Sequence, residues 1–166
     1  MVLPRRNRLR SLPLSFGACK LDGDLELDQN LLEHLPATFS ALKRLPGELC
    51  LARNRLSVLP CDIGRLEVGG HVNLASNALV RLPESFGGMA LGGNLDLSQN
   101  KLVTLPSSFR HLELKHQLDL RGNPLSNSNA GWRIEVDWLP RGIKEKAGHE
   151  NHGLFVPKNF EAHEYV

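Results

Sequence analysis

The sequence has few cysteines, no long apolar run and little net charge. The three cysteines stand at positions 19, 50 and 61, an odd set without CxxC spacing. They argue against a disulfide framework or a zinc knuckle and fit a reducing compartment. No apolar run approaches the about 20 residues of a membrane-spanning helix, and no continuous apolar segment resembles a secretory signal. We therefore predict a cytoplasmic protein that does not bind to a membrane.

The formal net charge of +2 over 166 residues is close to neutral. This net charge does not indicate the basic surface of a nucleic-acid-binding protein. A chain of this length buries one modest core, so a single folded unit is the starting expectation. The first twenty residues contain five basic residues and no acid, a composition that faintly suggests a transit peptide. Because their apolar residues fit the repeat described next, we interpret this segment as folded structure with arginines on its surface.

One pattern recurs through most of the chain. The stretch NLDLSQNKLVTLPSSF, residues 94–109, has near copies at residues 24–39, 48–63 and 73–86. Apolar residues precede each central asparagine by five and three positions and follow it by two, five and nine, with proline after the fifth-position leucine. The single longer interval comes from an extra residue between Leu42 and Leu45, which we expect in a surface turn. The asparagines are 23, 24, 23, 23 and 23 residues apart: Asn7, Asn30, Asn54, Asn77, Asn100 and Asn123.

Each fixed position has a physical explanation. Leucines in the LxL pair point the same way, as they do in a short strand with one buried face. The asparagine amide donates and accepts, so it can satisfy buried backbone groups in successive coils. A glycine seven residues before the next asparagine suits a tight return to the strand, at Gly23, Gly47, Gly70 and Gly93. Good N-cap residues precede the large apolar position and predict that a helical turn begins there, at Ser15, Thr38, Asp62, Ser85 and Ser108.

The pattern LxLxxNxLxxLPxxF at about 23 residues resembles the leucine-rich repeat family over residues 1–126. The LP followed by a large apolar residue is most similar to the intracellular class of these repeats. It is less similar to the bacterial effector ubiquitin ligases, whose repeats are shorter. The resemblance implies an α/β fold, a right-handed curved solenoid or horseshoe. A parallel β-sheet would form its concave face, and short helical or extended turns its convex face. Residues 127–166 would be a C-terminal capping segment and polar tail.

Candidate functional residues are those that vary where the fold leaves the residue type free. On the predicted strands these are the outward positions, which the resemblance places on the usual recognition face. We predict that they bind another protein carrying a basic or hydroxyl-rich strip; the alternative is a solvated face that only keeps the protein soluble. The residues assigned to this partner-binding face are Glu26, Asp28, Cys50, Asn73, Asp96, Ser98, Asp119 and Arg121.

We predict no catalysis, no cofactor and no metal site. Paired carboxylates such as Glu26 and Asp28 could act as acid and base, but an open sheet desolvates them little. Cys50 lacks the positive surroundings and the histidine partner of a reactive thiol. The predicted function is therefore a non-catalytic interaction module, an adaptor or a signalling scaffold. The alternative is the recognition fragment of a larger signalling or ubiquitin-ligase-type enzyme whose catalytic part is absent from this chain.

The repeat pattern ends after Asn123, and the segment that follows alternates Trp132, Ile134, Val136 and Trp138. Alternation predicts a half-buried strand, and the open end of a solenoid needs covering. Capping is the simpler interpretation, and an aromatic docking site is the alternative. The tail also contains three histidines, at positions 149, 152 and 163. A metal site needs ligands that converge from rigid elements, so we interpret these histidines as solvated.

At the other end, Val2 and Pro4 stand where the first strand's apolar pair belongs, with no capping unit before them. The first coil's apolar flank would then be bare. The chain is then either a fragment or a protein whose N-terminal edge contacts another molecule, including a second copy of itself.

Overall fold

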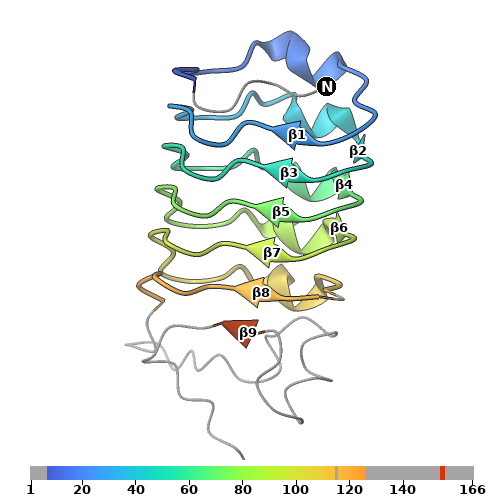
Figure 1. Ribbon diagram of the computed structural model, residues 1–166. Helices are drawn as coiled ribbons and strands as arrows, with labels where there is room; N and C mark the ends of the chain where they lie inside the picture. Colours follow the sequence, from blue (N-terminus) through green and yellow to red (C-terminus); the bar gives the residue numbers. More distant parts are fainter. Residues whose placement is uncertain (1–6, 115, 126–153, 156–166) are drawn as a thin grey trace, which may run out of the picture.

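A computed structural model describes residues 7–114, 116–125 and 154–155, and it shows stacked coils (Figure 1). One strand from each coil joins a six-stranded parallel sheet, which confirms the predicted solenoid architecture. From the first to the fifth strand of this sheet, partners differ by one repeat, as in Leu49 opposite Val72, whereas the last strand pairs Leu154 with Leu118. The strands in spatial order are β1 (Leu25–Glu26), β3 (Leu49–Cys50), β5 (Val72–Asn73), β7 (Leu95–Asp96), β8 (Leu118–Asp119) and β9 (Leu154–Phe155).

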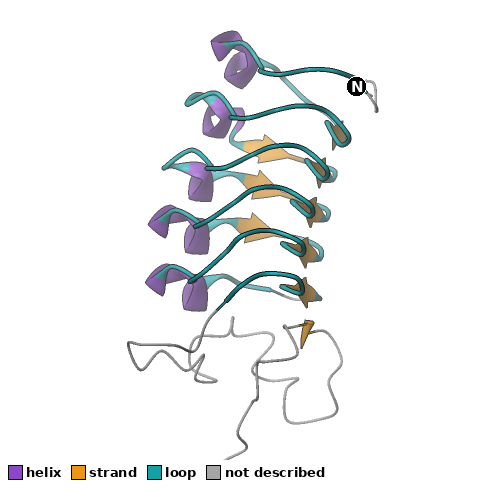
Figure 2. Cartoon of the chain, turned by 90° about the vertical axis from the view of Figure 1, so that its left-hand side faces the viewer, coloured by secondary structure: helices purple, strands orange, loops and turns teal. Residues whose placement is uncertain are grey.

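The far side of each coil carries a short 3-10 helix, and these helices stack on one another away from the six-stranded sheet (Figure 2). They are η1 (Leu14–Ala18), η2 (Phe39–Leu42), η3 (Ile63–Arg65), η4 (Glu84–Gly88) and η5 (Ser107–His111). A second parallel sheet, not predicted, follows the helices. It contains β2 (Arg44–Leu45), β4 (Glu67–Val68) and β6 (Ala90–Leu91).

The repeated apolar positions form one continuous interior. Leu27, Leu51 and Leu97 are fully buried, and so are Phe86 and Phe109 at the large apolar position. The rings of Phe86 and Phe109 stack between neighbouring coils, with centroids 6.1 Å apart. Because each coil contributes only a thin layer of side chains, no repeat can bury its apolar side without its neighbours.

The asparagines form the predicted ladder between coils. Asn54 donates from Nδ2 to the carbonyl oxygens of Leu51 in its own coil and Leu27 in the preceding coil. Its Oδ1 accepts the backbone N–H of Leu32 at 3.0 Å. Asn77, Asn100 and Asn123 repeat this arrangement one coil at a time. One side chain therefore satisfies backbone groups on two coils, as its amide chemistry predicts.

The predicted helical turns begin within one residue of the five polar residues, but the prediction that the side chains of these residues act as N-caps is wrong. In the described helices the N-cap residue itself makes no side-chain cap hydrogen bond; Thr38 and Asp62 occupy the N-cap position without one, while Pro13, Pro83 and Pro106 occupy it elsewhere. The 3-10 turn is instead closed by the large apolar residue, whose N–H reaches the carbonyl oxygen of the proline three residues earlier.

The polar side chains near the helix starts bind neighbouring coils instead. The hydroxyl of Thr38 donates to the Leu14 carbonyl oxygen at 2.5 Å, and the Ser85 hydroxyl accepts the Gly64 N–H at 3.2 Å. Ser15 and Ser108 lie inside their helices rather than at the caps. The side chains of Thr38 and Ser85 therefore link their helix starts to the preceding coil.

Two backbone features accommodate the repeat. The extra residue of the 24-residue interval lies at an exposed turn, as predicted, where Lys43 adopts a φ of 58° after η2. The residue before each asparagine turns the chain out of the strand with a positive φ between 53° and 72°, in the left-handed region. These residues are Gln29, Arg53, Ser76, Gln99 and Gly122.

Several predictions fall on residues outside the described ranges. They concern the capping strand at 132–138, the three tail histidines, and the bare N-terminal flank at Val2 and Pro4. Within 127–166 the structure describes β9, whose backbone pairs with β8. The division at residue 126 stays a prediction.

Candidate functional site

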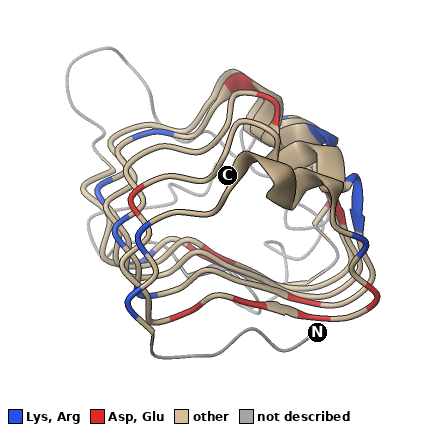
Figure 3. Cartoon of the chain, turned by 90° about the horizontal axis from the view of Figure 1, so that it is seen from above, with Lys and Arg blue, Asp and Glu red and all other residues tan. Residues whose placement is uncertain are grey.

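The predicted partner-binding residues lie on the outward side of the six-stranded sheet. Five of them are register partners in one row across the strands, and the other three lie two residues further along their strands. Arg121 is exposed and the rest are half-buried. Figure 3 shows acidic residues along this side and basic residues along the adjoining turns. We call this surface the sheet face: Glu26, Asp28, Cys50, Asn73, Asp96, Ser98, Asp119 and Arg121.

Three residues of this row also have a structural role that the sequence reasoning missed. The Asn73 side-chain oxygen accepts the backbone N–H of Ala75 at 3.0 Å. Asp96 does the same with Ser98 at 2.9 Å, and Asp119 with Arg121 at 3.0 Å. The signal was present in the sequence, because Asn and Asp commonly bind the backbone two residues ahead. A substitution at these positions therefore changes the local backbone as well as the charge.

Asp119 and Arg121, both assigned to the face, pair with each other. The guanidinium donates from Nε to both carboxylate oxygens at 3.0 and 3.1 Å, and a terminal nitrogen reaches Oδ2 at 2.6 Å. The hydrogen bond with Asp119 raises the pKa of Arg121, helped by the charges of Asp119 and Asp96. The acidic character of the face is consequently reduced at its β8 end.

The row of residues at the start of the strands links the coils rather than facing solvent freely. Asp24 Oδ1 accepts the Glu48 N–H at 2.8 Å, and Asn94 Oδ1 accepts the Gln117 N–H at 3.0 Å. His71 accepts the Asn94 N–H through Nδ1 at 2.7 Å, which leaves its Nε2 toward Glu48, 3.8 Å away. Three different side chains, those of Asp24, His71 and Asn94, thus accept a backbone N–H of the next coil. The residue type at this position varies, but the hydrogen bond between coils is kept.

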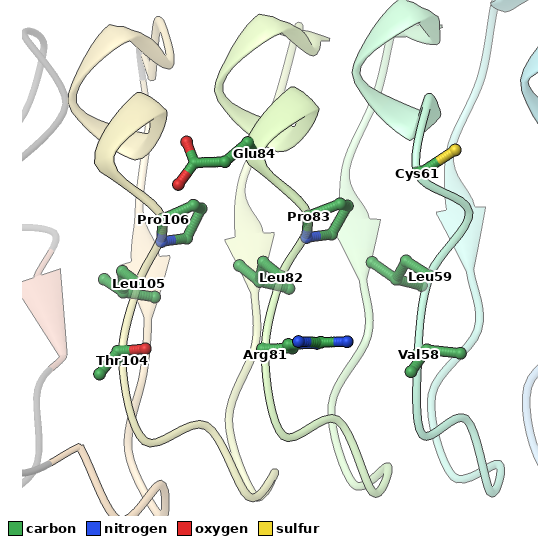
Figure 4. Close-up of a pocket in the computed structure, with 10 residues that line it drawn as sticks. All are labelled: Val58, Leu59, Cys61, Arg81, Leu82, Pro83, Glu84, Thr104, Leu105 and Pro106. Carbon is green, nitrogen blue, oxygen red and sulfur yellow. The ribbon is translucent and has the colours of Figure 1, made fainter.

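A cavity of the described ranges lies away from the sheet face, next to the turns, with a volume of about 460 Å³ (Figure 4). None of the three cysteines forms a disulfide. Among the described residues, no three His, Cys, Asp or Glu side chains converge as metal ligands, and no helix there is long and apolar enough to cross a membrane.

Comparison with known proteins decides the family. A model of the leucine-rich repeat matches residues 94–112. A solved structure of a leucine-rich repeat protein from Leptospira interrogans is similar, with a TM-score of 0.58 and 32% sequence identity. The chain belongs to the leucine-rich repeat family. The match covers 70% of this leucine-rich repeat chain and 30% of the Leptospira chain, so our chain spans about a third of that protein's length. No curated protein matches the chain.

Membership in this family indicates a general class of function. Leucine-rich repeats are generally non-catalytic protein-interaction modules, and the exposed, repeated surfaces of this solenoid suit that class. The residues that distinguish one leucine-rich repeat protein from another are those on the outside of the coils, which the fold leaves free.

Proposed function

We propose that this leucine-rich repeat chain is a non-catalytic adaptor or recognition module that binds a protein partner through the sheet face. The observation that supports the proposal is the row of register partners, in which Glu26 and Asp96 lie half-buried and outward. Cys50 and Asn73 separate Glu26 from Asp96 in this row. The two carboxylates are therefore roughly 14 Å apart, because neighbouring strands lie about 4.8 Å apart.

The chemistry of the face indicates the chemistry of the partner. Ala52, Ala75 and Ser98 are small and half-buried, so a partner segment can approach the backbone between the carboxylates. Lysine, arginine or hydroxyl groups on that segment would complement Glu26 and Asp28. Charges at such a half-exposed site mainly set the association rate and the salt dependence of binding. We therefore expect binding that weakens as ionic strength rises.

The test uses paired variants that remove equal charge from two surfaces. The sheet-face variant combines Glu26→Gln with Asp96→Asn; the amide preserves the acceptor for Ser98 N–H, as Asn73 shows for Ala75. The control combines Glu67→Gln with Glu113→Gln, which are exposed and lie on the second sheet and at its bridge to Ala90. Each protein is used for affinity capture from the native source, followed by mass spectrometry.

We expect a protein captured by the wild type and the control to be lost by the sheet-face variant, at unchanged melting temperature. Equal capture of every protein by both variants would contradict the proposal and favour a solvated face that only keeps the protein soluble.

A cytoplasmic location, a role in signalling and self-association through the N-terminal edge stay predictions. Light scattering over a concentration series tests the last of these. A monomer mass that does not change with concentration would contradict self-association.

A further inference from the structure

A groove crosses three successive coils on the side of the solenoid that follows the asparagine turns (Figure 4). Its side chains form rows with one member from each coil, and two of the rows are apolar. We call it the flank groove. It has a volume of about 460 Å³ and is lined by Val58, Leu59, Cys61, Arg81, Leu82, Pro83, Glu84, Thr104, Leu105 and Pro106.

The floor of the flank groove consists of leucines of the apolar interior that are not completely covered. The leucines five residues after each asparagine are incompletely covered: Leu59 is 8% exposed and Leu82 5%. Leu105, in the next coil, is half-buried. The strand leucines Leu51 and Leu97, by contrast, are 0% exposed. A ligand in the groove would therefore complete the burial of side chains that the fold leaves partly exposed to solvent.

Exposed apolar side chains concentrate beside this floor. Four large apolar side chains are well exposed within the described residues, and three of them belong to this flank: Val58, Val80 and Val103, at 45%, 49% and 43%. Val103 donates its backbone N–H to the Val80 carbonyl oxygen at 3.3 Å, so these two valines occupy neighbouring coils. A cluster of exposed apolar groups rimmed by polar residues is typical of an interaction site.

The groove also contains a cation without an ion-pair partner among the described residues. Arg81 is exposed and lies in the row between Val58 and Thr104 (Figure 4). The nearby carboxylate of Glu84 is directed the other way, onto the backbone N–H groups of Ser107 and Ser108 in the next coil. The guanidinium of Arg81 is thus available to a ligand carboxylate, which it can bind through two parallel hydrogen bonds.

We propose that the flank groove binds an extended peptide segment of another protein that carries a carboxylate beside apolar side chains. The carboxylate pairs with Arg81, and the apolar side chains cover Val58, Leu82 and Leu105. An extended segment that crosses the three coils can place its carboxylate at Arg81 and its apolar side chains on the row of leucines. This binding site is separate from the sheet face and does not depend on the function proposed for that face.

The experiment begins with a random dodecapeptide display library selected on the full immobilised chain. An enriched peptide is then synthesised with a fluorescent label, and its Kd is measured by fluorescence anisotropy. The variants are Arg81→Gln and Val58→Asp, both at residues that line the groove, with Arg65→Gln as the matched control. Arg65 is an exposed arginine at the end of η3. The sheet-face pair of substitutions, Glu26→Gln with Asp96→Asn, separates this site from the proposed one.

We expect enriched peptides to share Asp or Glu next to apolar residues. Arg81→Gln should raise Kd by about 10-fold or more, the usual effect of losing a charge-assisted hydrogen bond, and Val58→Asp should do the same by repelling the carboxylate. Arg65→Gln and the sheet-face pair should leave Kd unchanged. Because Val58 and Arg81 are exposed, neither variant should change the circular dichroism melting curve.

Three results would overturn the flank-groove proposal: no enrichment over an empty support, enriched peptides without a carboxylate, or a Kd that does not respond to Arg81→Gln. Binding that is lost in the sheet-face pair but kept in Arg81→Gln would assign the peptide to the sheet face. That outcome refutes the flank site and leaves the proposed function intact.

Discussion

The carboxylate of Glu84 accepts hydrogen bonds from both the backbone N–H and the hydroxyl of Ser107, each at 3.1 Å, although the two residues belong to different coils. It also accepts the Ser108 N–H at 3.2 Å. Ser107 and Ser108 are the first residues of η5, and helix-start N–H groups have no partner inside their own helix. An acid in one coil therefore caps the helix of the next and joins the two coils.

This cap should make stability depend on pH. The backbone hydrogen bond from Ser108 is the largest influence that holds the pKa of Glu84 below its ordinary value of 4.5, assisted by Ser107. A lowered folded-state pKa stabilises the fold above the unfolded-state value, and the contribution is lost as pH falls through the folded-state value. We expect Glu84→Gln to lower the urea midpoint at pH 7 and to differ progressively less from wild type below pH 4.5.

The measurement is a series of urea titrations from pH 7 to pH 3, with Glu113→Gln as a control that removes the same charge at an exposed site. A difference between wild type and Glu84→Gln that stays constant across this range would show that the carboxylate charge is not what holds the cap.

The asparagine ladder predicts a large loss when one member is replaced by an apolar residue of similar size. Asn100 donates to the carbonyl oxygens of Leu74 and Leu97 and accepts the Leu79 N–H at 3.1 Å, all buried. Asn100→Leu would leave these groups unsatisfied, so we expect the free energy of unfolding to fall by about 3 kcal/mol or more. Asn94→Leu, which removes one exposed hydrogen bond, should cost less than about 1 kcal/mol. Equal losses in chemical denaturation would contradict the structural role of the ladder.

Stacking of the 3-10 helices depends on glycine. A Cβ at Gly87 would lie 1.9 Å from the Ser108 carbonyl oxygen, whereas a Cβ at Gly88 would come no nearer than 3.3 Å to the Gly64 carbonyl oxygen. We expect Gly87→Ala to destabilise the protein by about 2 kcal/mol or more through overpacking, and Gly88→Ala by clearly less. Both changes lie in η4, so comparing the thermal unfolding of the two variants separates the close approach of Gly87 to Ser108 from the effect of backbone propensity. Identical melting temperatures for Gly87→Ala and Gly88→Ala would contradict a role for this close approach.

The extra residue of the long repeat offers a stabilising change. Lys43 is exposed with a φ of 58°, a region that costs L-residues energy and glycine little. We expect Lys43→Gly to stabilise the protein, raising the free energy of unfolding by about 1 kcal/mol. The exposed neighbour Arg44, in β2, is the control, because Arg44→Gly should destabilise. A lower urea midpoint for Lys43→Gly would show that the turn is unstrained.

The repeat could be predicted from the sequence because its signals are local and periodic. Leu27, Leu51 and Leu97 are buried where the pattern places them, and Asn54 makes the two-coil contacts that its amide suggests. The order of the strands within the repeats could also be predicted from the period, because each residue then lies next to its counterpart in the following repeat.

What could not be predicted depends on contacts between coils that no local pattern reports. Ser85 is a good N-cap type, yet its hydroxyl binds Gly64 of the preceding coil. Asp96 was assigned to partner binding, and its second role toward Ser98 required backbone geometry. The flank groove was missed because its exposed Val58 and Arg81 occupy a position that the repeat does not fix.

Photo-crosslinking tests the central claim, recognition through the sheet face, most directly. A photoreactive phenylalanine analogue replaces Ala75, half-buried on the sheet face, or Ala90, exposed on β6 of the second sheet. Both proteins are irradiated in extract of the native source. We predict a discrete crosslinked protein from position 75 that is absent from position 90 and competed by unlabelled wild type. Crosslinks from position 90 without any from position 75 would contradict the account.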